Sequence, residues 1–268
     1  MRTVPTHLFT PDFVKKKLVK ESSFVRDIHV FRRESWTNAL ARRLAASGAP
    51  TGTLVLAEKQ TAGKGRLGRS WSSPEGLGLW FSLVVRTAEL SVPVATLPLA
   101  LCADVALALR EQLELDFTVK WPNDILIDDS KVCGILCESS FVGQAVQYVV
   151  AGVGVNVNQA KSDFPEPVRA QATSLRLASG REQDRLAVLQ AILAKIEQRL
   201  GDAELAARAL DDWRRLCTDL GRTLRVQVDS RTLGGEFVDI SENGEMLFRE
   251  AGGKLHRFVC GQVTIVKL

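Results

Sequence analysis

Residues 58–71 combine glycines with positively charged side chains and could bind an anion. Gly63, Gly65 and Gly68 lack a side chain, so the backbone can approach a ligand closely. Backbone amides and cations in one loop form a site suited to phosphate. The alternative is a basic loop that is simply solvated. The cations of this loop are Lys59, Lys64, Arg66 and Arg69.

These glycines match the spacing G-x-G-x-x-G, but their surroundings argue against a Rossmann dinucleotide site. That site needs a strand directly before the glycines and a helix directly after them. Residues 53–57 are apolar enough for the strand, whereas Pro74, Gly76 and Gly78 are incompatible with the helix. A P-loop does not fit either, because no Gly-Lys-Ser/Thr follows at the required spacing. We therefore expect the loop to bind phosphate with its own amides and cations.

A second polar cluster lies at residues 119–125. Pro122 holds Trp121 extended and removes one donor from a strand ladder. Asn123 and Asp124 follow, between two apolar runs. In a β-bulge or turn this pair would be purely structural. At a ligand site, the carboxylate and the amide would instead lie beside a phosphate or its magnesium ion.

Further along the chain, glycines occur inside runs that are typical of strands. Lys131 opens an apolar run that contains Gly134. A lysine at a turn is usually just solvated, but the glycine here could accept a flat ligand. Gly152 and Gly154 would weaken their strand unless a ligand or another backbone needs the space. Asn156 then lies where this strand meets a loop.

The composition is that of an ordinary globular protein. The chain has 268 residues, of which 46% are hydrophobic and 25% charged. Its net charge of +4 does not by itself imply nucleic-acid binding. No apolar stretch follows the N-terminus as in a signal peptide. The most apolar segment, residues 92–109, contains Pro93, Pro98 and Asp104, so it predicts a buried helix and not a membrane span.

The five cysteines are scattered, which favours reduced thiols and a cytoplasmic protein. Cys133 and Cys137 are four residues apart, on one face of a predicted strand. No histidine lies near them in the sequence, so no zinc site is expected.

The hydrophobic pattern predicts strands and helices in alternation, followed by an all-β tail. After Gly221 short alternating strands follow, and Asn243-Gly244 is a strong hairpin signal. A small barrel of about 45 residues fits this tail. The expected strands are residues 24–33, 53–57, 77–86, 117–127, 131–141 and 145–155, and the expected helices are residues 37–47, 96–113, 184–200 and 203–220, with Thr96 as a helix cap.

The order and spacing of these clusters resemble the biotin protein ligases. The resemblance covers nearly the whole chain, from about Phe31 to Leu268. Four motifs in the same order make it specific. They are Gln60…Gly63-Lys64-Gly65-Arg66-Leu67-Gly68-Arg69…Trp71, Lys120-Trp121-Pro122-Asn123-Asp124, Lys131…Gly134-Ile135-Leu136…Glu138, and Gly152-Val153-Gly154-Val155-Asn156.

The resemblance implies an α+β fold in two domains. Residues 1–220 would form a class II synthetase-like catalytic domain, a mixed β-sheet with helices on one face, and residues 221–268 an SH3-like β-barrel. The implied activity adenylates biotin with ATP and Mg²⁺, with neither zinc nor haem. Biotin then passes to a lysine of a biotin carboxyl carrier domain, in acetyl-CoA carboxylase or a related carboxylase.

The same resemblance implies roles for individual residues. Lys131, Arg66 and Asp124 would be catalytic, and Asp124 would also bind Mg²⁺. The implied biotin-binding residues are Thr37, Asn38, Gln60, Gly63, Lys64, Trp71, Lys131, Gly134 and Leu136. The implied ATP-binding residues are Gly65, Arg66, Gly68, Arg69, Asn123 and Asn156.

The chain departs from the family pattern at three positions. Trp36 stands where the family has serine, Lys64 where arginine is commoner, and Gln262 where glutamate is usual. Replacing arginine by lysine keeps the charge but loses the two-pronged donor. Fewer than about 35 residues precede the catalytic strand, too few for a DNA-binding domain of typical size. We therefore expect a monofunctional enzyme that binds neither DNA nor membrane and that could form a homodimer.

In this reaction the carboxylate of biotin is itself the nucleophile, so catalysis consists mostly of positioning and charge stabilisation. Two other functions stay open. A lipoate or octanoate ligase or transferase has a related fold, and an octanoyl transferase would use an acyl-accepting cysteine such as Cys133 beside Lys131. A non-catalytic sensor of biotin or nucleotide is the other alternative.

Overall fold

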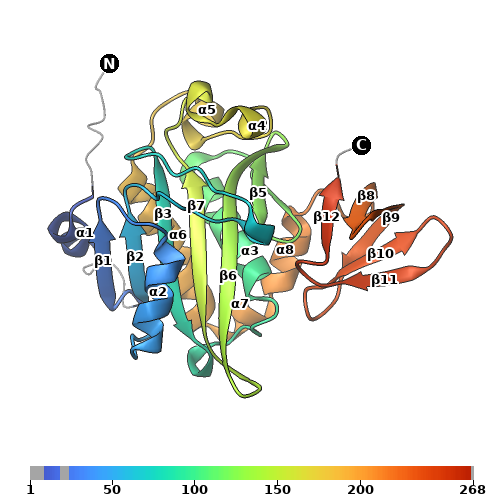
Figure 1. Cartoon of the computed structure of the whole chain (residues 1–268), viewed down its shortest axis with the longest axis horizontal. Coiled ribbons are helices and arrows are strands. Elements are labelled where there is room, and N and C mark those ends of the chain that lie inside the picture. Colours follow the sequence, from blue (N-terminus) through green and yellow to red (C-terminus); the bar gives the residue numbers. More distant parts are fainter. Residues whose placement is uncertain (1–8, 19–23, 267–268) are drawn as a thin grey trace.

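A mixed β-sheet forms the centre of the computed structural model, which describes residues 9–18 and 24–266 (Figure 1). Within these residues seven strands pair in the order β1-β2-β3-β7-β6-β5-β4. The β1–β2 pair is parallel and the other pairs are antiparallel. The strands are β1 (Asp27–Phe31), β2 (Thr53–Ala57), β3 (Gly78–Arg86), β4 (Thr118–Lys120), β5 (Asp124–Ile127), β6 (Ser130–Val142) and β7 (Ala145–Asn156).

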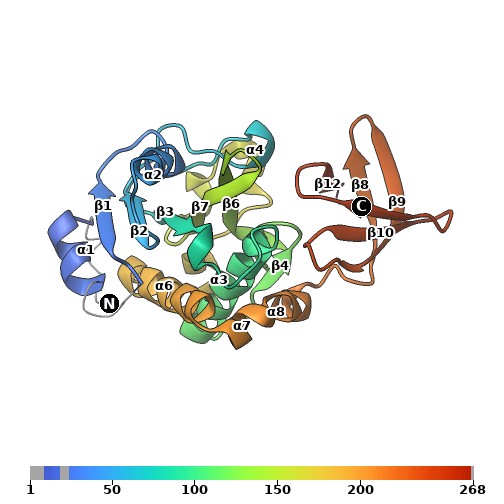
Figure 2. The ribbon, with the colours of Figure 1, turned by 90° about the horizontal axis from the view of Figure 1, so that it is seen from below.

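Helices cover the sheet unequally, as Figure 2 shows. The main helical layer packs on one face, where side chains such as Leu79, Phe81 and Leu83 of β3 join the large core. The helix α2 (Thr37–Ala46) lies on the opposite face, where Ala41 and Ala45 pack on other sheet residues. The main layer contains α3 (Leu97–Leu113), α6 (Arg185–Gly201), α7 (Ala203–Ala207) and α8 (Ala209–Leu216). None of the helices in the described residues is long and apolar enough to cross a bilayer.

Shorter elements connect these layers. A helix packs beside β1 near the described start of the chain, and two short helices follow β7 (Figure 1). These elements are α1 (Pro11–Leu18), η1 (Arg66–Gly68), η2 (Thr87–Glu89), η3 (Lys161–Asp163), α4 (Glu166–Arg169) and α5 (Leu175–Ser179).

The tail forms a second, five-stranded antiparallel sheet with the order β11-β10-β9-β8-β12. Phe237 and Phe248 are buried in its small core, which is consistent with an SH3-like barrel. We propose a domain boundary between residues 220 and 221, since the strands of this sheet begin at Thr223. They are β8 (Thr223–Val228), β9 (Arg231–Ile240), β10 (Met246–Glu250), β11 (Leu255–Phe258) and β12 (Val263–Val266).

The structure corrects three details of the predicted elements. The strand expected at residues 117–127 is interrupted between β4 and β5, at Trp121 and Pro122, because proline cannot donate to the ladder. The helix expected at residues 203–220 is divided into α7 and α8. Thr96 does not cap α3 with its side chain, since its hydroxyl donates instead to the carbonyl of Pro93 at 3.0 Å.

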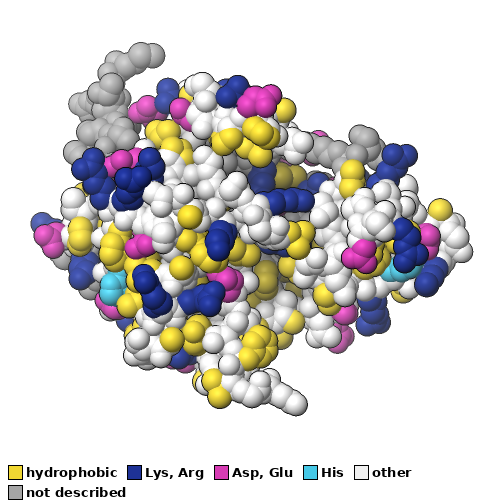
Figure 3. All heavy atoms as spheres, in the orientation of Figure 1, with side chains coloured by type: hydrophobic (Ala, Val, Ile, Leu, Met, Phe, Trp, Pro, Cys, Tyr) yellow, Lys and Arg dark blue, Asp and Glu magenta, His cyan; other side chains and the backbone are white. Residues whose placement is uncertain are grey.

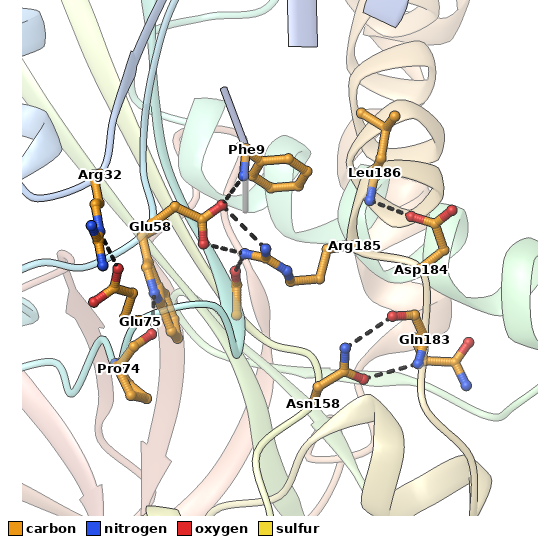
Figure 4. Close-up of polar contacts among 12 residues, drawn as sticks. Phe9, Arg32, Glu58, Pro74, Glu75, Asn158, Gln183, Asp184, Arg185 and Leu186 are labelled. Atoms are coloured by element: carbon orange, nitrogen blue, oxygen red, sulfur yellow. Dashed lines mark hydrogen bonds and ion pairs between the residues drawn. The ribbon is translucent and has the colours of Figure 1, made fainter. Parts of the chain in front are cut away.

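A buried ion pair fixes the start of the basic loop, residues 58–71, to the helical layer (Figure 4). The Glu58 side chain is 0% exposed and that of Arg185 4%, and their nitrogen–oxygen distances are 2.8 and 3.1 Å. Arg185 also donates to the Gly78 carbonyl at 3.2 Å. The amide of Phe9 donates to Glu58, and the Phe9 ring lies 4.4 Å from the guanidinium carbon. Residues 58 and 78, on either side of the loop, are therefore held to the first residue of α6.

We predict that Arg185→Met lowers the free energy of unfolding by about 3–5 kcal/mol, because it leaves the Glu58 carboxylate buried without its cation. The double variant Glu58→Leu/Arg185→Met should be much less destabilised. Urea unfolding measures both. The control is Arg32→Met, which removes an exposed ion pair with Glu75 and should destabilise the protein much less. Equal losses for Arg185→Met and Arg32→Met would contradict the prediction.

Candidate active site

A cavity of about 860 Å³ lies where the basic loop crosses the sheet. The start of α2, the loop, the β4–β5 turn and the strands β6 and β7 contribute to its walls. Residues from the segment after β7 and from the barrel complete the lining. Residues from all four sequence motifs, which are up to about a hundred positions apart in the sequence, therefore line the same cavity.

One end of the cavity contains a hydrogen-bonded network of polar side chains, of which Thr37, Asn38 and Gln60 line the cavity and are uncharged. The Gln60 side-chain oxygen accepts hydrogen bonds from the amide and the hydroxyl of Thr37, at 2.9 and 3.1 Å. Ser82 Oγ lies 2.7 Å from Thr37 Oγ1 and 2.6 Å from Asn38 Oδ1. Asn38 also donates to Glu138 at 2.8 Å. These bonds hold the amide and hydroxyl groups in place before any ligand binds.

Glycines on β6 and β7 make room for side chains of the site. A Cβ atom on Gly154 would lie 2.6 Å from Trp71 Nε1, and one on Gly134 3.2 Å from the same indole ring. A Cβ on Gly152 would lie 2.1 Å from Asn38 Oδ1. The sequence predicts space here for a ligand or a backbone, whereas the structure fills it with Trp71 and Asn38. The indole thus forms an apolar surface between the two ends of the cavity.

The other end of the cavity carries charge. Lys131 pairs with Asp124 at 2.6 Å, and its ammonium lies 5.2 Å from the centre of the Trp71 ring. Arg66 Nη1 donates to Asn123 Oδ1 at 3.1 Å, while Arg66 Nη2 is buried without a hydrogen-bond partner in the described residues. A buried guanidinium donor without a partner is costly unless an anion binds it. This end is therefore suited to a phosphate or carboxylate.

Most of the predicted site residues line this cavity, and two do not. Gly63 lies behind it, where a Cβ would come 2.7 Å from the Trp71 carbonyl, and Gly68 forms the left-handed turn of the loop at φ +72°. The predicted residues in the lining are Thr37, Asn38, Gln60, Lys64, Gly65, Arg66, Arg69, Trp71, Asn123, Asp124, Lys131, Gly134, Leu136 and Asn156.

The sequence analysis did not assign several other residues of the lining. Trp36, noted only as a departure from the family, lies 4.8 Å from the ammonium of Lys64. Phe164 and Val168 also line the cavity, and so does Gln159, whose side-chain oxygen is buried without a partner in the described residues. Gln159 comes shortly after the motif that ends at Asn156, so its position in the sequence could have suggested that it belongs to the site. Phe164 follows η3 and Val168 lies in α4, in a segment of the sequence without a motif.

The structure argues against Cys133 as a nucleophile. Its side chain is 0% exposed on β6, and burial raises the pKa of its thiol well above the ordinary value. A thiol that stays protonated and inaccessible does not accept an acyl group. Within the described residues, no group of three or more His, Cys, Asp or Glu side chains is arranged to hold a metal.

The comparisons with known proteins identify the family. The model of the biotin/lipoate A/B protein ligase family matches residues 30–156. The bifunctional ligase/repressor BirA of Bacillus subtilis is 38% identical over 226 residues, covering 82% of this chain and 68% of the relative. The chain belongs to the biotin protein ligases of this family. The biotin--[acetyl-CoA-carboxylase] ligase of Mycobacterium tuberculosis is 33% identical over 268 residues, covering 94% of this chain and 93% of the relative.

A solved structure supports the same assignment. The biotin protein ligase from Aquifex aeolicus in complex with biotin and ATP matches with a TM-score of 0.73 and 29% identity. The match covers 91% of this chain and 100% of that one. The fold of this biotin ligase therefore extends through both domains.

We predict that Lys131→Ala lowers biotin-dependent pyrophosphate release by roughly 10²–10³-fold, because the ammonium stabilises charge on the transferring phosphate. The matched control is Lys195→Ala, which removes a lysine that also pairs with a carboxylate at 2.6 Å but lies outside the cavity lining. Circular dichroism establishes that both variants fold. Near-normal release by a folded Lys131→Ala protein would show that the assignment is wrong.

We predict that Gly152→Ala raises the KM for biotin roughly 10–100-fold, because the new methyl group displaces Asn38 and breaks its hydrogen bonds. Steady-state kinetics at saturating ATP measure the change. Gly201→Ala is the control, since a Cβ there has nothing within 4 Å. An unchanged KM for biotin in Gly152→Ala would remove Asn38 from the biotin site.

Proposed function

We propose that this biotin protein ligase binds biotin across the cavity, with the ureido ring at Thr37, Asn38 and Gln60 and the carboxylate near Arg66 and Lys131. The observation that carries the proposal is the polarity of the cavity. Uncharged hydrogen-bonding groups lie at one end, cations at the other, and the Trp71 ring between them. Biotin has the same sequence of groups: a polar ring, an apolar chain and a carboxylate.

In the first half-reaction, an oxygen of the biotin carboxylate attacks the α-phosphorus of ATP. The bond from that phosphorus to the β-phosphate oxygen breaks, and pyrophosphate leaves with biotinyl-5'-AMP as the product. Arg66, with its unpartnered donor, and Lys131 neutralise the charge that develops on the phosphate oxygens. Catalysis then depends on fixed cations and on alignment, without a nucleophile from the protein.

Asp124 is our candidate for the Mg²⁺ that accompanies ATP. Mg²⁺ typically takes only one or two protein carboxylates and the phosphates of the nucleotide. Asp124 lines the cavity, and one of its carboxylate oxygens pairs with Lys131. The other oxygen is then available to bind the Mg²⁺ ion. The ion would supply positive charge to the phosphates, and Asn123 would keep Arg66 directed toward them.

In the second half-reaction, the amine of an acceptor lysine attacks the acyl carbon of the adenylate, and AMP leaves. We assign to Asp124 the uptake of the amine proton. The acceptor that we propose is the biotin carboxyl carrier domain of acetyl-CoA carboxylase or a related carboxylase, and the expected location is the cytoplasm. The biotin--[acetyl-CoA-carboxylase] ligase of Mycobacterium tuberculosis, whose name specifies such a carboxylase, supports this acceptor.

We predict that ATP releases pyrophosphate with biotin but not with lipoate or octanoate, when the three acids are offered in parallel. The amide network at the uncharged end supports this, because an alkyl chain cannot form hydrogen bonds with Thr37, Asn38 and Gln60, whereas a ureido ring can. Faster release with lipoate or octanoate would favour the lipoate branch of the family. No release with any of the three acids would favour a non-catalytic sensor.

A further inference from the structure

Two cations that line the cavity have no role either in the sequence analysis or in the mechanism above. They are Lys120, the last residue of β4, and Arg222, which lies directly before β8 of the barrel. In the part of the chain that the structure describes, neither side chain forms an ion pair. Cations usually line a cavity without a partner only where water or an anionic ligand can reach them.

Backbone contacts connect the segments that carry these two residues, although the segments are far apart in the sequence. Val119 and Cys217 form a parallel bridge, so the linker between α8 and the barrel runs along β4. The indole of Trp121 donates to the Gly244 carbonyl of the barrel at 3.0 Å. The carbonyl of Arg222 in turn accepts from the Phe237 amide on β9 at 3.0 Å. Arg222 is thus fixed to the barrel, and the barrel is fixed to the residue after Lys120.

Figure 3 shows Lys and Arg side chains in the hollow between the catalytic domain and the barrel. Lys120 is the register partner of Asp124, so it lies one strand spacing, about 4.8 Å, beyond the residue that pairs with Lys131. The hollow therefore continues the charged end of the cavity toward the barrel.

Two parts of the lining suit the two ends of a nucleotide whose α-phosphate lies at Arg66 and Lys131. The segment after β7 contributes Phe164, Val168 and the buried amide of Gln159, which suit a flat base. The strand β4, the β5–β6 turn and the linker to the barrel contribute the two cations and the carboxylates of Asp129 and Asp219. Cations suit the polyphosphate, and carboxylates suit the Mg²⁺ bound to it.

We propose that Lys120 and Arg222 bind the β- and γ-phosphates of ATP and hold the pyrophosphate as it leaves. This inference rests on the proposed function and assigns to the barrel a residue of the ATP site. When the bond between the α-phosphorus and the bridging oxygen breaks, that oxygen gains negative charge. Cations fixed beside it stabilise the leaving group without reorganising.

The test measures the two half-reactions separately in Lys120→Gln and Arg222→Gln. We expect the KM for ATP in adenylate formation to rise about 10-fold or more in each variant, as charge-assisted hydrogen bonds to phosphate are lost. Inhibition by added inorganic pyrophosphate should weaken as well. Transfer of biotin from preformed biotinyl-5'-AMP should be unchanged, because that step involves no pyrophosphate.

The controls are Arg225→Gln, an exposed arginine on β8 outside the lining, and Lys195→Gln on α6. Lys120→Arg and Arg222→Lys, which keep the charge, should recover part of the affinity for ATP. An unchanged KM for ATP in both glutamine variants would overturn the inference. An equal loss in transfer from preformed adenylate would also overturn it, and would indicate contact with the carrier instead. A wild-type protein without biotin-dependent pyrophosphate release would instead contradict the proposed function.

Discussion

The site depends on the buried ion pair between Glu58 and Arg185. The loop that begins at Glu58 supplies the amide of Gln60, the guanidinium of Arg66 and the indole of Trp71. Repulsion between the cations of this glycine-rich loop disfavours an ordered position over the sheet. The pair with Arg185, the bond from Arg185 to Gly78 and the contact with Phe9 fix its stems in a buried environment. Together with the hydrogen bonds from the amides of Thr61 and Ala62 to the carbonyls of Glu34 and Ser35, that anchor places the loop's side chains at the cavity.

A second constraint is the lack of side chains on one surface of the sheet. Gly134, Gly152 and Gly154 create a groove on β6 and β7, and the groove is filled by Trp71 and Asn38. The glycines therefore position protein groups, which in turn form the surface for the ligand. This arrangement separates an uncharged end from a charged end within one cavity. In the function that we propose, one end of this site binds the uncharged ring of the acid and the other end binds its carboxylate and the nucleotide.

The barrel has its own sheet but is also part of the site. Its buried residues Phe237 and Phe248 belong to the same hydrophobic cluster as the core of the catalytic domain, and Leu224 and Ile265 line the cavity. Trp121 links the two units through its hydrogen bond to Gly244. The motif that surrounds Trp121 thus has two functions. Asn123 and Asp124 face the charged groups, while the indole holds the barrel against the opening of the cavity.

The sequence by itself determined which groups are available and the local structure around them. Pro74, Gly76 and Gly78 rule out a Rossmann helix, and the Asn243-Gly244 turn together with the alternation after Gly221 predicts the small β-domain, because these are local backbone preferences. Four motifs in fixed order also predicted the family, and most of the site residues that the resemblance implies do line the cavity. Only the tertiary structure decided how those groups are used. Burial removed Cys133 from consideration, Trp71 filled the space over the glycines, and the α8–barrel linker brought Arg222 to the cavity beside Lys120. Each of these outcomes depends on packing between segments that are distant in the sequence. The hydrophobic periodicity and the propensity of one segment do not say which other segment it packs against.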